Sequence, residues 1–243
     1  MQTADAKPMM VPMARHTSVP VEASTPIRVT SRSGSVEITG EARADVLVES
    51  GADQVEPGPD GLDIAGRSGK IVARCPAGAD VFVGCRSGTV TLHGAFGDSR
   101  VTTHSGSITV EQAKSVDART ASGSIVVDDC SGECRGQTKS GSIRVGRAGS
   151  ADLAAASGSV EVGAVGAARV RAGSGTVTVG LTEPAPVDIE AHSGSVTVTV
   201  PDGVHPQFDL HTMSGEVRCD CESGTDGSIR VTARSGRISV LER

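Results

Sequence analysis

Small aliphatic residues recur along the chain at fixed distances from a repeated Ser-Gly pair. Apolar residues stand two and four positions after the glycine and five and seven positions before it in most copies, usually 17 or 18 residues apart. Alternation at a period of two places every second side chain on one face, which is typical of a half-buried β-strand. The repeated glycines are Gly34, Gly69, Gly88, Gly106, Gly123, Gly141, Gly158, Gly175, Gly194, Gly215 and Gly236.

The spacing of these apolar positions predicts a coil with three corners. Wherever the gap between inward positions widens from two to three residues, two side chains face outward together and the chain turns. The Ser-Gly pair would mark one corner, with its serine among the inward positions and its glycine free to adopt a positive φ. Ser50-Gly51 falls halfway along the one double-length gap and is interpreted as a degenerate further copy.

The fold class that follows is all-β: a single parallel β-helix, or β-solenoid, of about 12 coils of 17–21 residues. Successive coils would stack as parallel strands about 4.8 Å apart, and right-handed winding is expected from the general rule for parallel crossovers. Residues 1–26 contain several prolines and are predicted to be a flexible N-terminal segment, with the solenoid domain over residues 27–243. No signal peptide is evident, which predicts a cytoplasmic protein, or a cell-surface or secreted protein if an export signal has been removed.

Composition narrows the possible functions. The chain has a formal net charge of −6 and three aromatic residues, all phenylalanine, which argues against binding to nucleic acid. No apolar run approaches the length of a membrane span. The scarcity of aromatic residues also indicates a narrow core built from thin layers of Val, Ile and Ala.

Charged residues form a further pattern, six positions before each repeated glycine. Their sign alternates at every copy from Arg100 to Asp188. Residues of this column would sit one strand apart in a stacked solenoid, so that opposite charges face each other and a slipped register is penalised. The repeated serine is interpreted as structural, with hydroxyl groups that bond to each other or to the corner backbone.

The sequence predicts no metal, no cofactor and no catalytic residues. Cys130 and Cys134 are spaced like half of a zinc site, as are Cys219 and Cys221, but the two pairs are four to five coils apart and cannot share one ion. Most of these cysteines fall in inward columns, where cysteine behaves as a small hydrophobe, and a Cys130–Cys134 disulfide would require an oxidising compartment.

Insertions are concentrated in the C-terminal copies, after the second strand, at residues 182–186, 201–206 and 221–227. Insertions in solenoids gather on one edge, which is often the edge that binds a partner. The candidate recognition residues in these loops are Thr182, Glu183, Asp202, His205, Glu222 and Asp226.

The repeated Ser-Gly-Ser-Val/Ile pattern, as at Ser105–Val110, Ser122–Val127 and Ser193–Val198, resembles the bacterial β-strand-repeat "putative adhesin" family of unknown function. The resemblance covers residues 27–243 and implies a parallel β-helix from a bacterium, with no mapped site. The sequence therefore favours a non-enzymatic binding or scaffold module with a protein or polysaccharide partner. A self-assembling scaffold resembling the bactofilins, with end-to-end association, is the alternative, and a polysaccharide-acting enzyme is the third hypothesis.

Overall fold

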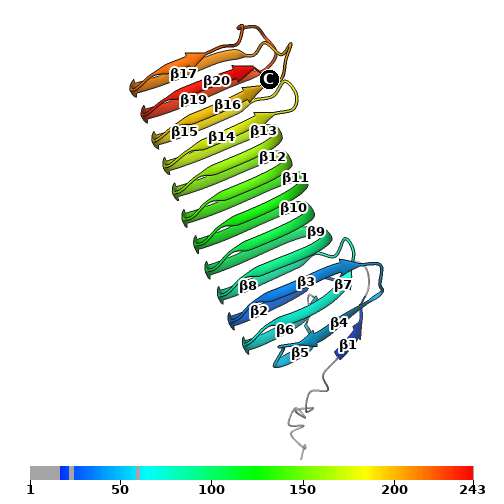
Figure 1. The fold of residues 1–243 in the computed structure, drawn as a ribbon. Coiled ribbons are helices and arrows are strands. Elements are labelled where there is room, and N and C mark those ends of the chain that lie inside the picture. The colour runs from blue at the N-terminus through cyan, green and yellow to red at the C-terminus, as the bar shows by residue number, and fades with distance from the viewer. Residues whose placement is uncertain (1–16, 22–24, 59–60, 243) are drawn as a thin grey trace, which may run out of the picture.

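The computed structural model describes residues 17–21, 25–58 and 61–242, which form one long solenoid of strands (Figure 1). The predicted flexible segment lies mostly outside these residues, but its Thr17–Pro20 forms a strand. The strands are β1 (Thr17–Pro20), β2 (Ile27–Ser33), β3 (Val36–Glu41), β4 (Asp45–Ser50), β5 (Gln54–Gly58), β6 (Gly61–Ser68), β7 (Ile71–Pro76), β8 (Val81–Ser87), β9 (Val90–Ser105), β10 (Ile108–Ser122), β11 (Ile125–Ser140), β12 (Ile143–Ser157), β13 (Val160–Ser174), β14 (Val177–Leu181), β15 (Val187–Ser193), β16 (Val196–Val200), β17 (Gln207–Ser214), β18 (Val217–Cys219), β19 (Ser228–Ser235) and β20 (Ile238–Glu242). Among the described residues there is no helix that could cross a membrane.

The Ser-Gly corners stack in a single column, as predicted. The eleven repeated glycines all have positive φ, between 101° and 155°. For ten of them, an added Cβ would press into the carbonyl oxygen of the neighbouring corner glycine, because the corners lie directly on one another. Only glycine combines this backbone conformation with so close an approach, so the column sets both the corner and the stacking.

The inward columns form the core. Val110 pairs with Val127 and Val127 with Val145 in parallel register, and each of these side chains is at most 1% exposed. Side-chain sizes also match across rungs, since Leu153 packs over Gly136, where an added Cβ would lie 2.9 Å from its methyl group. Each rung therefore buries its inner face against its neighbours, which is how a solenoid gains stability.

Chain order and spatial order differ at both ends of the solenoid. β2 lies between β6 and β8, so the first copy of the repeat is inserted between the next two. At the other end β19 lies between β15 and β17, so the last copy is inside the stack and β17 and β18 form its terminal rung (Figure 1). The last copy along the chain is therefore not the last rung in space.

The predicted number of about 12 coils is slightly too high, because eleven Ser-Gly corners stack in the column. Ser50-Gly51 does not form a corner of the column. Instead β4 runs antiparallel to β7 and to β1, and β5 runs antiparallel to β6. The segment from β4 to β5 is thus a cap on the first rung and not a coil.

The repeated serine is not an inward residue. Ser105, Ser122 and their equivalents are exposed on the outer side of the corner. Three buried hydroxyl groups belong to threonines three positions before the glycine, namely Thr103, Thr120 and Thr138, and Ser31 and Ser99 are buried as well. The hydroxyl of Thr103 donates to that of Thr120 at 2.9 Å, and Thr120 donates to the carbonyl of Gly106 at 3.2 Å.

One rung departs from the regular inward spacing. Phe96 is buried and pairs with the buried Ala113 of the next rung, whereas Ala95 before it is only half-buried. Gly94, with a φ of 87°, introduces the extra residue, and the pairing of β9 with β10 shifts at this point. The bulge gives the core its single fully buried aromatic ring among the described residues.

Candidate binding surface

The three inserted loops lie together at the C-terminal end of the solenoid. The backbone N–H of His205 donates to the carboxylate of Asp226 at 3.1 Å, and the N–H of Asp226 donates to the carbonyl of His205 at 2.9 Å. The loop of residues 182–186 joins them, because an added Cβ on Gly227 would lie 2.9 Å from the backbone nitrogen of Ala185. The loop of residues 221–227 is in the middle, since the last two rungs are exchanged in space.

The six predicted recognition residues divide into two groups. Thr182, Glu183, Asp202 and Glu222 are exposed, and none of them lines the groove described below. His205 and Asp226 are half-buried and hold their two loops together. Within the described ranges no group of three or more His, Cys, Asp or Glu side chains is arranged to hold a metal ion.

A shallow groove of about 700 Å³ runs along the solenoid beside this loop cluster. It is lined by the residues eight, seven and six positions before the corner glycine in five rungs that are adjacent in space, formed by β12, β13, β15, β19 and β17, together with Glu133 of β11. We call this feature the axial groove. Because each rung contributes the same three positions, the groove crosses the strands and follows the axis.

The axial groove was not predicted from the sequence, although a signal for it was present. The column eight positions before the glycine has short side chains in three of the five rungs, Ser150, Ala167 and Ser228, and none of them is buried. They lie beside the long charged side chains six positions before the glycine. This difference in length between two accessible columns is visible in the sequence.

The wall of the axial groove is the charge column, whose order in space is more regular than its order along the chain. The column is formed by the residues six positions before the corner glycines. In stacking order these are Asp63, Arg28, Phe82, Arg100, Asp117, Arg135, Asp152, Arg169, Asp188, Arg230 and Asp209. Apart from the phenylalanine, the sign alternates at every step.

Phe82 takes the place of an acidic residue in this alternation. The guanidinium carbons of Arg28 and Arg100 lie 6.0 Å and 5.9 Å from the centre of its ring. The face of an aromatic ring carries partial negative charge and attracts a cation, so Phe82 separates two arginines that would otherwise repel each other. Asp45, which stands six positions before Gly51, belongs to the N-terminal cap instead of the charge column.

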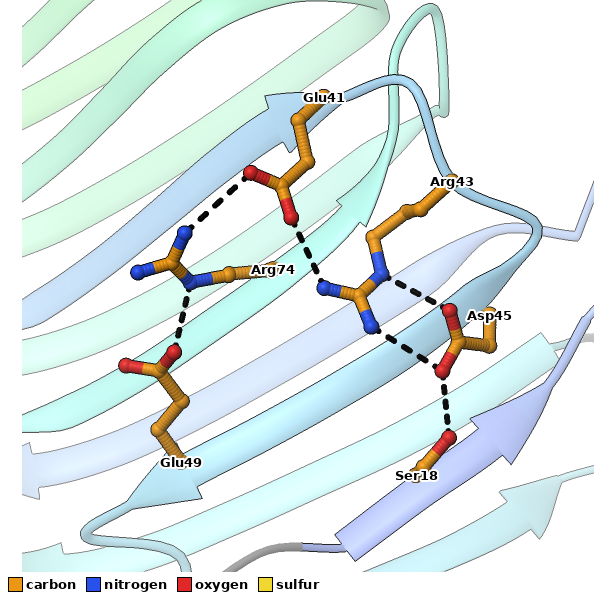
Figure 2. A network of polar contacts seen from close by, with 6 residues as sticks. All are labelled: Ser18, Glu41, Arg43, Asp45, Glu49 and Arg74. Carbon is orange, nitrogen blue, oxygen red and sulfur yellow. Dashed lines mark hydrogen bonds and ion pairs between the residues drawn. The ribbon is translucent and has the colours of Figure 1, made fainter.

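A second polar cluster occupies that cap and is structural (Figure 2). Arg43 contacts Asp45 and Glu41, each at 2.9 Å, while Arg74 reaches Glu49 at 2.6 Å and Glu41 at 3.3 Å. The hydroxyl of Ser18 in β1 also donates to Asp45. Figure 2 shows these side chains directed toward one another, so the cluster fastens β1 and β4 to the first rung.

Hydrogen bonds explain the protonation behaviour of this cluster. Arg43 and then Ser18 stabilise the carboxylate of Asp45 and lower its pKa below the ordinary 3.8. The same contact with Asp45 raises the pKa of the Arg43 guanidinium. All charged groups in the cluster are paired with one another, which fits a structural role.

The cysteines lie in separate environments. Cys75, Cys85, Cys130 and Cys134 are buried thiols, while Cys219 is exposed because it belongs to the terminal rung. Cys130 and Cys134 lie on either side of the irregular stretch of β11. The hydrogen bond with Cys130, together with burial, raises the pKa of the Cys134 thiol. This pair packs as core residues, as the inward columns predict.

Parallel stacking, a glycine corner column and a lateral groove define a β-solenoid repeat protein. The chain belongs to the Toastrack DUF4097 family, whose model matches residues 27–241. This family accords with the resemblance that the Ser-Gly repeat carried.

The chain is also similar to several solved structures at low sequence identity. One is described as a "putative adhesin" from Bacteroides fragilis NCTC 9343, with 13% identity, coverage of 96% of this chain and 99% of that chain, and a TM-score of 0.41. Another, from Parabacteroides distasonis ATCC 8503, is also described as a "putative adhesin", with 13% identity, coverage of 94% and 96%, and a TM-score of 0.39. A third is described as a "putative cell adhesion protein" from Clostridium sporogenes ATCC 15579, with 10% identity, coverage of 94% and 99%, and a TM-score of 0.22. A search of curated proteins finds no match.

Proposed function

We propose that this protein is an adhesin-like module that binds an extended polysaccharide along its axial groove, without catalysing a reaction. The observation that carries the proposal is the groove itself, which offers the same three positions from successive rungs at a spacing of about 4.8 Å. A ligand that lies along the axis would meet a periodic surface. Extended polymers with a short repeat are the class of ligand suited to it.

The lining of the groove supports a polysaccharide more than other polymers. Alternating carboxylate and guanidinium groups can accept from and donate to sugar hydroxyls, while small apolar residues such as Ala168 form the floor. The six charged residues of the lining comprise four acidic and two basic side chains, which disfavours a polyanion.

The pairing of the charged groups supports binding over catalysis. Asp209 lies 2.9 Å from Arg230, and Asp188 lies 3.4 Å from Arg169. Glu133 and Asp152 also lie within 4.0 Å of an arginine. Glycoside hydrolysis uses two carboxyl groups that exchange a proton or a bond with the substrate, whereas each carboxylate here is in an ion pair.

Filament formation by end-to-end stacking is a weaker candidate. Such a filament needs an open rung at both ends of the solenoid, and here β4 and β5 cover β7 and β6 at the N-terminal end. We therefore favour binding along the side of the rod.

A glycan array with matched variants tests the proposal. Ala167→Arg would place a long side chain in the groove, while Ala164→Arg changes the same residue type in the same strand outside it, and both alanines are half-exposed. We expect the wild-type chain and Ala164→Arg to retain the same glycans and Ala167→Arg to lose them. Binding of no glycan, or equal binding by both variants, would refute the proposal.

A further inference from the structure

The two ends of the solenoid differ in how their strand edges are protected. At the N-terminal end, β5 and β4 cover the first rung in antiparallel orientation, and the outer strands β5 and β1 each contain a proline, Pro57 and Pro20. Short edge strands with proline resist further pairing, because proline donates no hydrogen bond to a neighbouring strand. This end is blunted.

The terminal rung at the C-terminal end has no such protection. Within the described residues β17 pairs only with β19, and β18 only with β20, so one edge of each is free. β17 is eight residues long and contains no proline. A long free edge of this kind is a template for another strand.

The inner side chains of this rung are also uncovered. Val217 is 42% exposed, whereas Ile238, its neighbour in the same inward column, is fully buried. Leu210 is only partly buried, while its neighbour Val231 is 0% exposed. The rung thus presents one side of a core layer to solvent, which favours a covering partner.

We propose that two copies of the chain associate tail to tail through antiparallel pairing of β17 with β17 of the second copy. A two-fold axis through the edge of β17 makes the two strands antiparallel and uses the same surface on both copies. It would join the two uncovered core layers and leave the blunted ends outermost. The assembly is therefore a closed dimer and not a filament.

The side chains of β17 select one register for this pairing. Each inward-facing residue must pair with an inward-facing residue of the second copy. The two-fold axis must therefore pass through a residue, which can be Asp209, Leu210 or His211, and not between two residues. A centre on Asp209 sets two carboxylates against each other, and a centre on His211 sets two imidazoles together. A centre on Leu210 places Asp209 opposite His211 of the second copy, twice by symmetry, with an N–H donor facing each carboxylate.

The charge column gives independent support. Its last member in space is Asp209, which follows Arg230, so the alternation calls for a donor or cation next, and His211 of the second copy supplies it. Head-to-tail stacking would instead bring Asp209 toward Asp63 and Glu56, which face each other at the N-terminal end. Like charges opposite each other disfavour that contact.

Sedimentation equilibrium of the full chain over a range of concentrations tests the dimer. We expect a reversible equilibrium between monomer and dimer without larger species. His211→Asp sets two pairs of carboxylates against each other and should raise the dissociation constant about tenfold. Gln137→Asp introduces the same residue in the same outward column of a central rung, where Gln137 is also exposed. This variant should leave the dissociation constant of the dimer unchanged.

A cross-link fixes the register without relying on affinity. In a Cys219→Ser, Cys221→Ser background, Leu210→Cys should form a disulfide-linked dimer with diamide as oxidant, because the two copies of residue 210 face each other. Gln137→Cys in that background should stay uncross-linked. The proposal would be overturned by a monomer at every concentration or by assemblies larger than a dimer. It would also be overturned by a dimer whose dissociation constant is unchanged in His211→Asp and which is not cross-linked through Leu210→Cys. His211 does not line the axial groove, so His211→Asp should bind the same glycans as the wild type. A failure of the dimer can therefore be distinguished from a failure of groove binding.

Discussion

The guanidinium of Arg230 lies 2.9 Å from the carboxylate of Asp209, although Arg230 follows it by 21 residues and belongs to a later copy of the repeat. Arg230 is also the neighbour of Asp188 on its other side. The later copy is therefore inserted between two earlier ones, and a cation separates two carboxylates that would otherwise be adjacent. The exchanged order of the last two rungs and the charge column are consistent with each other.

Reversing this charge should destabilise the C-terminal rungs. Arg230→Asp would place three carboxylates in succession, and we expect a loss of about 1 kcal/mol in the free energy of unfolding, as for like charges opposite each other in a sheet. Arg234→Asp alters an exposed arginine of the same strand outside the charge column and serves as the control. Urea titration measures both variants, and equal losses would mean that the column has no specific role.

The same two residues show why the order of the rungs was not predicted. Along the chain the alternation fails twice, once where Asp188 precedes Asp209 and once where Asp45 precedes Asp63. Both failures disappear in space, because one copy is inserted between neighbours and Asp45 is part of the cap. The repeat determines which residues face inward. The long connections near the C-terminus, however, allow the chain to skip a rung and return to it, and the spacing of apolar residues does not determine this spatial order.

The spacing of residues along the chain was sufficient to predict the corner and the core of the solenoid, but not the features of its surface. Corner glycines and inward valines such as Val127 follow from spacing alone, because the period of two is a property of the strand. Ser122 was placed inward by the same counting, whereas the corner turns it to solvent. The loop cluster was located by its insertions, but the axial groove depends on how side chains of different length stack across rungs.

The corner glycine column predicts a position-dependent response to alanine. Gly123→Ala combines a φ of 141° with an overlap between the new Cβ and the carbonyl of Gly106, and should cost about 3 kcal/mol or more. Gly69 has a φ of 101° but stands at the end of the column, with nothing within 4 Å of an added Cβ. Gly69→Ala should therefore cost about 1 kcal/mol, from backbone strain alone. Chemical denaturation compares the two, and the reverse order would show that the corners do not stack as described.

The N-terminal cap should weaken in acid. Because the pKa of Asp45 is lowered in the folded chain, its stabilising effect is complete above the ordinary value of 3.8 and is lost as the pH falls through the lowered value. The difference in unfolding free energy between the wild type and Asp45→Asn should be largest at neutral pH and should shrink below about pH 4. Denaturation at several pH values measures it.

Arg43→Gln provides the matched background for this experiment. Removal of the arginine takes away the main cause of the shift, so Asp45→Asn should then have little effect at neutral pH. A full effect of Asp45→Asn in that background would mean that the carboxylate stabilises the cap through contacts other than Arg43.

Thiol reactivity should distinguish the terminal rung from the core. Cys219 is exposed in β18, whereas burial raises the pKa of Cys75 to about 12 and that of Cys221 to about 11. Because the thiolate is the reactive form, we expect Ellman's reagent to modify Cys219 rapidly, Cys221 slowly and Cys75 only after unfolding. Cys219→Ser should abolish the fast phase in dilute protein. If Cys75 reacted as rapidly as Cys219 in the folded chain, the first rung would have to open freely, and the cap formed by β1, β4 and β5 would not protect it.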